Sequence, residues 1–293
     1  FAASNLGYKP VLLAGTEEQK QWASDILLEG GYGAFCLTEP MGGSDPSCCK
    51  TTAVKDGDDY IINGRKCFIT NGGVADFYIV TAMTDKSKGV KGMSAFYVEK
   101  GTEGLSVGNE ENKMGIRTSN TTDVVFEDMR VPASALIGKE GEGFKIAMQT
   151  LDMARAIMGI GAVGVAQRAI DEAVAYSKQR ITFGQPIGKF EAIQFMIADM
   201  EIKTETARQM SLHAMQLQEQ GLPYSKESAI AKCYAGDSAV QVALDAIQIL
   251  GGYGYSREYP VEKLLRDAKI FQIYEGTNQV QRMVISRAVM GRF

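Results

Sequence analysis

The pattern of apolar and polar residues changes character twice along the chain. Residues 1–29 contain a short helical pattern, in which Thr16 suits the N-cap and two glutamates follow in the first turn, where the helix dipole favours them. From residue 32 to about residue 137 the pattern is one of short strand-like runs separated by Gly, Asp and Asn. After Gly138 apolar residues recur with the 3.6-residue period of amphipathic helices.

These patterns locate individual elements. The strand-like runs are AFCLTE, YIING, FYIVTAM, MSAFYVE and TTDVVFED. The helical segments lie near residues 142–179, 190–219, 226–250, 260–270 and 279–290, with Gly-containing or Pro-containing breaks between them. Short strands at this spacing favour a sandwich or a barrel over a βαβ sheet, so we predict a β domain followed by an up-and-down helical bundle.

Composition narrows the function classes. The 293 residues are 45% hydrophobic, and 31 basic and 35 acidic residues are mixed along the chain to a net charge of -4, so no basic field is available for nucleic acid. The chain contains no run of 18 apolar residues, so no membrane-spanning helix is predicted. The five cysteines form no CxxC pair, which favours reduced thiols, and a single histidine leaves little material for a metal site or for His-based catalysis. We therefore expect no metal.

Two glycine-bearing loops follow strand-like runs. The first, Thr38 to Asp45, reads TEPMGGSD and carries several hydroxyl and main-chain donors. Glycine lets such a loop approach the ring or phosphate of a cofactor, but the loop lacks the lysine and following helix of a P-loop, so a plain turn is the alternative. The second, Phe68 to Gly73, reads FITNGG and is open to the same two interpretations.

Three breaks between helical segments carry further candidates. RITFGQP, from Arg180 to Pro186, either ends a helix with a basic residue or offers an arginine to a diphosphate and Phe183 to an aromatic ring. QILGG, from Gln248 to Gly252, by itself signals a helix end. IYEGTNQ, from Ile273 to Gln279, places a carboxylate directly before a glycine and behind an Ile-Tyr pair that is typical of buried positions.

Taken in order, these motifs resemble the acyl-CoA dehydrogenase family. The resemblance is carried by AFCLTEPMGGSD (34–45), YIINGRKCFITNGG (60–73), DVVFEDMRVP (123–132), YSKQRITFGQPIGKFEAIQFMIADM (176–200) and DAIQILGGYGYSREYPVEKLLRDAKIFQIYEGTNQVQ (245–281). Together they cover nearly the whole chain. FYIVTAMTDKSKG and GGYGYSREYP are most similar to the bacterial short-chain, butyryl-CoA branch.

The resemblance implies an α+β multidomain fold. Residues 1–31 would end an N-terminal helical domain, residues 32–138 would form a mostly antiparallel middle domain of sandwich-like or barrel-like form, and residues 139–293 would form an up-and-down four-helix bundle. The family residues expected ahead of Phe1 are absent from this chain, which favours a fragment. A cytoplasmic location is expected in a bacterium and the mitochondrial matrix in a eukaryote.

An FAD between the β domain and the bundle is also implied. The matching positions in the β domain are Phe35, Leu37, Thr38, Gly43, Ser44, Phe68, Ile69 and Thr70. In the bundle, the positions that match contacts with the FAD of a neighbouring subunit are Arg180, Phe183, Gln248, Gly251 and Gly252, and further FAD contacts match Thr277 and Gln279. A homo-oligomer, by resemblance a tetramer, is therefore expected.

Glu275 matches the family's catalytic base. The α-proton of a thioester is weakly acidic, so a base must lie within hydrogen-bond reach while charge developing on the carbonyl is stabilised. The resemblance implies that this proton passes to Glu275 while a hydride leaves the β-carbon for flavin N5, which yields a trans-2-enoyl-CoA. Positions that match contacts with the CoA thioester are Ser44, Asp152, Arg155, Tyr274 and Gly276.

Two positions distinguish this chain within the family. Some branches carry the base directly before the bundle arginine, and here that position is Ala154, which cannot abstract a proton. Glu191 stands where the family usually has Gln, and a carboxylate near a diphosphate would be repelled unless it were protonated or paired with Lys189 or Arg180.

The favoured function is an FAD-dependent dehydrogenase of short-chain acyl-CoA that passes electrons to an electron-transfer flavoprotein. The alternatives are the reverse, enoyl-CoA reductase direction, an acyl-CoA oxidase-like flavoenzyme, and a non-enzymatic member that serves as an assembly partner.

Overall fold

A computed structural model describes residues 6–291, so residues 1–5 of the expected N-terminal segment lie outside the described part. The chain forms two compact units. The first, here the β unit, runs to Asn112 and includes Arg117–Leu151; the second, here the helical unit, comprises Lys113–Ile116 and the chain from Asp152 onward. The expected domain boundaries at 31/32 and 138/139 stay predictions.

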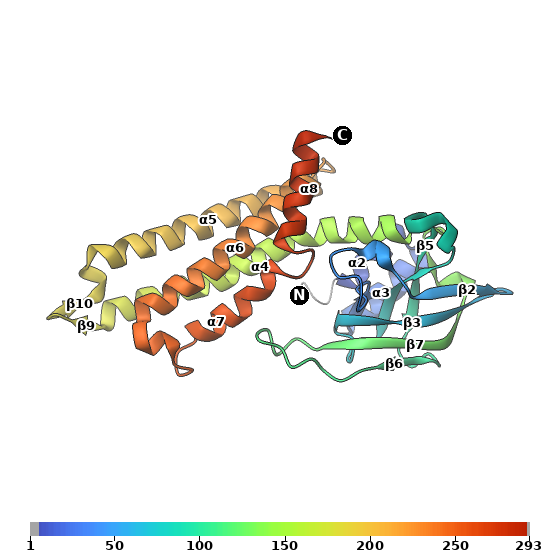
Figure 1. The fold of residues 1–293 in the computed structure, drawn as a ribbon, viewed down its shortest axis with the longest axis horizontal. Coiled ribbons are helices and arrows are strands. Elements are labelled where there is room, and N and C mark those ends of the chain that lie inside the picture. The colour runs from blue at the N-terminus through green and yellow to red at the C-terminus, as the bar shows by residue number, and fades with distance from the viewer. Residues whose placement is uncertain (1–5, 292–293) are drawn as a thin grey trace. The chain divides into compact units, whose positions relative to one another are not determined.

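Figure 1 shows strands gathered in the β unit and long helices in the helical unit. The helices are α2 (Tyr8–Ala14), α3 (Glu17–Leu28), α4 (Gly143–Gln179), α5 (Glu191–Glu219), α6 (Ser225–Leu250), α7 (Val261–Ala268) and α8 (Asn278–Met290). The strands are β1 (Gly33–Cys36), β2 (Thr52–Asp56), β3 (Asp59–Thr70), β4 (Phe77–Met83), β5 (Met93–Glu99), β6 (Leu105–Val107), β7 (Thr121–Pro132), β8 (Leu136–Ile137), β9 (Ile181–Thr182) and β10 (Gln185–Pro186).

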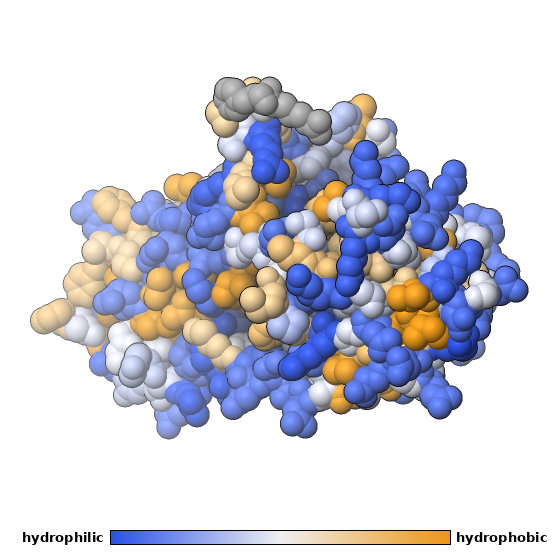
Figure 2. Space-filling model, turned by 45° about the vertical axis from the view of Figure 1, so that its right-hand side comes forward, coloured by the Kyte–Doolittle hydropathy of each residue, from blue (hydrophilic) through white to orange (hydrophobic). Residues whose placement is uncertain are grey.

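Within residues 6–291, no helix combines the length and apolar character that a membrane crossing requires. In Figure 2, polar side chains cover much of the visible face, and apolar side chains form separate patches among them. Large apolar residues that are exposed in this chain include Ile181, Phe183 and Phe195 of the helical unit.

The predicted mostly antiparallel β domain is confirmed. Its sheet has the order β6-β7-β3-β2-β4-β5-β8, and only β1 and one bridge of β2 run parallel to β4. Every residue of β4 is buried, because alternate side chains enter two cores. Tyr78 and Val80 point into the core enclosed by the strands, and Phe77 and Ile79 pack with residues of α2 and α3.

The expected N-cap also fixes how α3 begins. Thr16 and Gln19 form a capping box, since the Thr16 hydroxyl accepts the Gln19 N–H and the Gln19 amide oxygen accepts the Thr16 N–H. Trp22 of this helix packs on the rings of Phe77 and Tyr97, with centroids 5.4 and 4.8 Å away. The helix is thereby held against β4 and β5.

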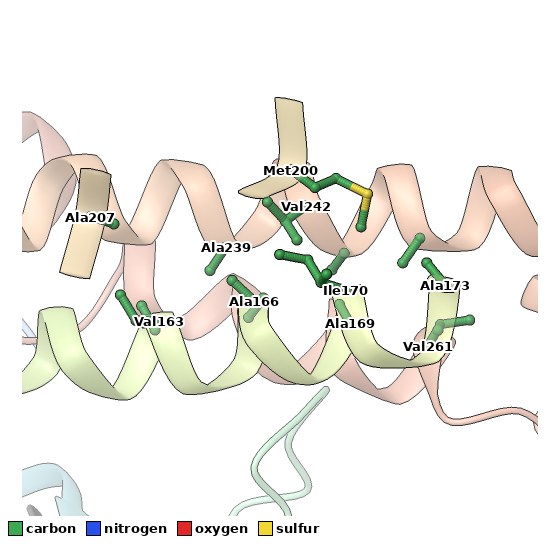
Figure 3. Packing of buried hydrophobic residues seen from close by; sticks show 14 of the residues in the cluster. Val163, Ala166, Ala169, Ile170, Ala173, Met200, Ala207, Ala239, Val242 and Val261 are labelled. Carbon is green, nitrogen blue, oxygen red and sulfur yellow. The ribbon is translucent and has the colours of Figure 1, made fainter. Parts of the chain in front are cut away.

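The helical unit is built around small side chains. Ala166, Ala169 and Ala173 of α4 face Ala239 and Val242 of α6 in a core that also takes Met200 of α5 (Figure 3). Small residues let the helices approach closely, which suits long helices packed side by side. The helical C-terminal domain predicted from the 3.6-residue period is confirmed, and α5 and α8 begin within one residue of the expected positions.

Candidate functional site

The two glycine-bearing loops of the β unit lie side by side. The main-chain oxygen of Thr38 accepts the Cys67 N–H at 2.9 Å, and the oxygen of Leu37 accepts from Lys66 Nζ at 3.2 Å. These bonds tie the start of the TEPMGGSD loop to the end of β3, just before Phe68. Within this unit the structure therefore brings together the two segments that the sequence marked as FAD contacts.

A buried ion pair supports this junction from below. Lys66 Nζ lies 2.8 Å from Glu39 Oε1, and the two side chains are 0% and 5% exposed. Glu39 also accepts the main-chain N–H groups of Lys50 and Thr51 and the Thr51 hydroxyl. Burial by itself would raise the pKa of Glu39, but the charge of Lys66 and these donated hydrogen bonds lower it to about 2. The Glu39 carboxylate is therefore ionised at neutral pH, and its oxygens are engaged by these hydrogen bonds and by Lys66.

Phe68 lies at a β-bulge. The pairing of β3 with β7 advances three residues on β3, from Lys66 to Ile69, against two on β7, from Val124 to Thr122. Phe68 takes up the extra residue with a φ of 54°, a conformation that is costly for an aromatic residue, and its ring is 66% exposed. The bulge thus turns a large flat side chain out of the sheet.

The other expected residues of the β unit divide into two groups. Phe35 and Ile69 are buried in its cores, so their side chains shape the loops from beneath. Gly43 and Ser44 are exposed, and a Cβ added at Gly43 would meet nothing within 4 Å. Thr38 and Thr70 are half-buried. An exposed aromatic ring, accessible hydroxyls and a bare main-chain loop fit a flat polar ligand such as a flavin.

At the far end of α6, a second group of expected residues lines a groove of about 650 Å³. Arg180, Gly251 and Gly252 contribute to its wall, and the Arg180 guanidinium lies 5.6 Å from the centre of the Tyr253 ring. A Cβ at either glycine would meet nothing within 4 Å. The groove therefore offers a cation, aromatic surface and open main chain, which suits an anionic ligand with an aromatic part. Gln248 is exposed in the last turn of α6.

Phe183 projects from the hairpin beside this groove. Thr182 pairs with Gln185, which leaves Phe183 and Gly184 as a two-residue turn with φ values of 50° and 77°. Two consecutive positive φ values are the signature of a type I′ turn. The Phe183 ring is 91% exposed, and its nearest aromatic neighbour is Phe190, with centroids 6.2 Å apart.

Glu275 occupies the turn between the 3-10 helix η6 (Lys269–Gln272) and α8. Its φ is 57° and that of Gly276 is 84°, so two consecutive residues are left-handed. Glycine is required at 276, because its φ disfavours other residues and an added Cβ would lie 2.7 Å from Gln281 Nε2. Glu275 has to be held in this conformation by its surroundings, and its Oε2 atom is buried.

The other expected thioester contacts of the helical unit lie next to Glu275 in the chain and on α4. Tyr274 packs edge-on against Phe271, with centroids 5.4 Å apart, and burial together with the Glu275 charge raises the pKa of its hydroxyl. On α4, the Arg155 guanidinium is 4% exposed and pairs with Asp152. Ala154 is also buried and carries no ionisable group.

The two expected FAD contacts just after the turn differ in environment. The Thr277 hydroxyl is the N-cap of α8 and accepts the Val280 N–H at 3.2 Å, so one of its lone pairs is engaged while its proton can still be donated. Gln279 lies one residue into α8 and is exposed. Thr277 therefore starts the helix as well as being a candidate ligand contact.

The Glu275 turn contacts the first half of α6, whereas the groove lies at its C-terminal end. Lys232, near its start, contacts the Glu275 turn, and Gly251 follows its last residue. At 1.5 Å per residue, these two positions are roughly 28 Å apart. Within one chain the groove and the turn are too far apart to contact the same end of one ligand, so each belongs to a separate part of the binding apparatus.

Glu191 begins α5, and none of the ion pairs among the described residues joins it to Lys189 or Arg180. The first turn of a helix is favourable for a carboxylate, which gives this residue a local role. Among the described residues, the structure therefore shows neither of the two ion pairs that would offset repulsion between Glu191 and a diphosphate.

Sequence reasoning missed three buried polar residues that hold the site loops: Lys66, Lys232 and Gln281. Lys232 donates to the Gly276 carbonyl, and Gln281 donates to the carbonyls of Glu275 and Gly276. A signal was available for Lys232, because it lies in the alanine-rich run AIAKCYAG at a position where a helical period predicts burial. A lone lysine on a buried helix face requires a partner.

Comparison with known proteins gives the class. The family model described as the acyl-CoA dehydrogenase middle domain matches residues 34–129, and that of the acyl-CoA dehydrogenase C-terminal domain matches residues 141–290. The chain belongs to the acyl-CoA dehydrogenase family, and the resemblance seen in its motifs is confirmed. This family is flavin-dependent.

Individual relatives are similar over almost the whole chain. A short-chain specific acyl-CoA dehydrogenase of Clostridium acetobutylicum is 52% identical over 93% of this chain and 72% of the relative. The butyryl-CoA dehydrogenase structure from Megasphaera elsdenii is 49% identical, with a TM-score of 0.97 over 99% of this chain and 76% of that one. A chain from a study of the electron transferring flavoprotein of Acidaminococcus fermentans, concerned with flavin-based electron bifurcation, is 54% identical, with a TM-score of 0.97 over 99% and 77%.

Proposed function

We propose that this protein is an FAD-dependent dehydrogenase of short-chain acyl-CoA thioesters and that Glu275 is its catalytic base. The observation that carries the proposal is the Glu275 turn, where a glutamate is held in a left-handed conformation with one carboxylate oxygen buried. Strained residues of this kind persist where the surroundings over-determine them, which is common at active sites. The alternative base position holds Ala154, so Glu275 takes this role alone among the two family positions.

Proton abstraction follows from the properties of the turn. The Glu275 carboxylate accepts the α-proton of the thioester and becomes a neutral acid, and the electron pair of that C–H bond forms the new double bond. Bound FAD supplies the acceptor for the hydride that leaves the β-carbon. The product is a trans-2-enoyl-CoA. Gly276 lacks a side chain beside the carboxylate, and Arg155 and Tyr274 line the same part of the helical unit as candidate thioester contacts.

Two sets of residues would hold the cofactor. In the β unit these are Leu37, Thr38, Gly43, Ser44, Phe68 and Thr70, supported from the core by Phe35 and Ile69. In the helical unit, Arg180, Phe183, Gln248, Gly251 and Gly252 would contact the FAD of a neighbouring subunit in a homotetramer. The distance of roughly 28 Å along α6 between the groove and the Glu275 turn supports this division. Thr277 and Gln279 of the helical unit are further proposed FAD contacts.

An electron-transfer flavoprotein is the proposed partner that removes the electrons. The similarity to a chain from the Acidaminococcus fermentans study supports this choice. The similarity to short-chain specific and butyryl-CoA dehydrogenases supports a short acyl chain.

Anaerobic titration of the purified full-length protein tests the proposal. We expect a yellow protein whose flavin absorbance is bleached by butyryl-CoA more effectively than by octanoyl-CoA. Replacing the base in Glu275→Gln should slow bleaching by about 10² to 10⁴-fold, the usual contribution of a general base. A colourless protein would favour the assembly-partner alternative, fast reoxidation by oxygen would favour an oxidase-like enzyme, and undiminished bleaching in Glu275→Gln would remove Glu275 from the mechanism.

A further inference from the structure

A buried lysine lies directly beneath the Glu275 turn. Lys232 of α6 is 2% exposed, and its Nζ donates to the main-chain oxygen of Gly276 at 2.7 Å and to Asn278 Oδ1 at 3.0 Å. Among residues 6–291 no carboxylate lies within 4 Å of this ammonium group. The ammonium group therefore interacts directly with a main-chain carbonyl and a side-chain amide oxygen of the turn.

Gln281 reaches the same turn from the α8 side. Its Nε2 donates to the main-chain oxygen of Glu275 at 3.1 Å and to that of Gly276 at 2.9 Å. Gln281 is 0% exposed. The Gly276 carbonyl thus accepts two hydrogen bonds, which uses both of its lone pairs. The peptide planes on either side of Gly276 are held by side chains from two different helices.

Asn278 extends the anchoring to the rest of α6. Its Oδ1 accepts from Lys232, and its Nδ2 donates to the Cys233 oxygen at 3.0 Å and to Asp237 Oδ1 at 2.8 Å. Asp237 also accepts from Gln272, the last residue of η6. Both ends of the Glu275 turn are consequently fixed to one face of α6.

The charge of Lys232 is retained against a cost. Burial lowers the pKa of Lys232 to about 8. The neighbouring Cys233, Glu275 and Asp237 act to raise this pKa, and the charge of Arg155 lowers it further. The ammonium form therefore still predominates at neutral pH. An apolar residue of similar length would avoid this cost, so stability alone does not account for a lysine here.

We propose that Lys232 is a positioning residue for the catalytic base. Its ammonium group donates a hydrogen bond to the Gly276 carbonyl and thereby stabilises the left-handed turn. This turn sets the direction of the Glu275 carboxylate. The inference rests on the proposed role of Glu275. It differs from that role because Lys232 acts only through the turn and touches neither substrate nor cofactor.

The test compares Lys232→Met with Thr204→Val in the flavin-loaded, full-length protein. Thr204 is a matched control, since it is also buried in the helical unit and also donates to a main-chain oxygen, that of Met200 at 2.9 Å. Exchange of the α-hydrogens of butyryl-CoA with D₂O, followed by NMR, reports the position of the base without requiring hydride transfer. Flavin content, thermal midpoint and the dissociation constant of butyryl-CoA are measured alongside.

In Lys232→Met we expect α-hydrogen exchange and flavin reduction to fall by about 10²-fold, the usual effect of a misplacement near 1 Å. The dissociation constant and flavin content should stay within about threefold of wild type, because the lost interaction acts on the rate and not on binding. Thr204→Val should keep both rates. Lys232→Gln, which retains a donor but no charge, should recover part of the exchange rate.

Should Lys232→Met fail to fold, Gln281→Met removes the second grip on the same carbonyls and should show the same selective loss of exchange. Exchange in these variants equal to that in Thr204→Val would overturn the inference while leaving Glu275 as the base. Wild-type protein that neither exchanges the α-hydrogens nor is bleached by any acyl-CoA would instead refute the proposed function, and the inference would fall with it.

Discussion

Each unit of the molecule buries a lysine beneath a functional loop, and the two lysines are neutralised differently. Lys66 in the β unit forms an ion pair with Glu39 at 2.8 Å and also donates to Thr81 Oγ1. Within residues 6–291, Lys232 of the helical unit donates to the Gly276 carbonyl and to the Asn278 amide oxygen and to no carboxylate. Lys66 and Glu39 cancel each other's charge locally, whereas the field of Lys232 reaches the Glu275 carboxylate.

The difference separates a structural tie from a positioning group. The Glu39 carboxylate accepts from five donors, and this buried ion pair is costly to break because removal of one partner leaves a desolvated charge. Lys232 donates directly to neutral acceptors, so its removal breaks no direct ion pair among the described residues, although it removes a charge that acts on Glu275. The Lys66 site should therefore report mainly on stability, and the Lys232 site mainly on rate.

The largest expected effect comes from Lys66→Met. It leaves the Glu39 carboxylate buried without its cation, so the free energy of unfolding of the β unit should fall by about 3 to 5 kcal/mol. Hydrogen exchange of the amides of β3 measures the change in that unit alone. The double variant Lys66→Met/Glu39→Gln removes both charges and keeps an amide oxygen to accept from Lys50 and Thr51, so it should regain part of the loss. A single variant as stable as wild type would show that the pair does not hold the loop junction.

Acid should weaken the same site next most strongly. The pKa of Glu39 is about 2 in the folded protein against 4.5 for an ordinary glutamate, so its contribution is complete above pH 4.5 and is lost as the pH falls toward 2. The loss should approach about 3 kcal/mol over this window. Unfolding free energies of wild type and the double variant, measured across it, isolate the contribution. Parallel curves for the two proteins would contradict the assigned pairing.

Alkaline pH should raise the stability contributed at the Lys232 site, whereas acid lowers that contributed by Glu39. The pKa of Lys232 is about 8 when folded against 10.5 for an ordinary lysine, so between these values the unfolded chain binds the extra proton and stability rises with pH. Relative to Lys232→Met, wild type should gain about 3 kcal/mol across the window. Amide exchange in α6 measures this difference. If the stability of wild type instead fell relative to the variant as the pH rose, the folded protein would stabilise the charged form of Lys232, contrary to the lowered pKa.

Local signals predicted much of this architecture. Thr16 with Gln19 and the Gly and Pro breaks between the C-terminal helices act within a few residues, so the starts of α3, α5 and α8 follow from them. The short strands β2, β6 and β8 were not predicted, because they depend on pairing with distant strands more than on their own pattern. The parallel pairing of β1 with β4 is a further product of such long-range contacts.

For the site, the sequence by itself determined the chemistry and the tertiary structure decided how it is held. The match of IYEGTNQ to the family's motif, with Ala154 at the other base position, leads to the prediction that Glu275 is the base, because residue identity decides whether a group can accept a proton. The partners of the turn come from positions 44 and 46 residues earlier in the chain, where Lys232 meets Gly276 and Asn278. No periodicity links such positions. Packing of α6 against α8 is what brings the Lys232 ammonium group to the Gly276 carbonyl. The fold likewise joins Lys66 to Glu39, which are 27 residues apart in the sequence.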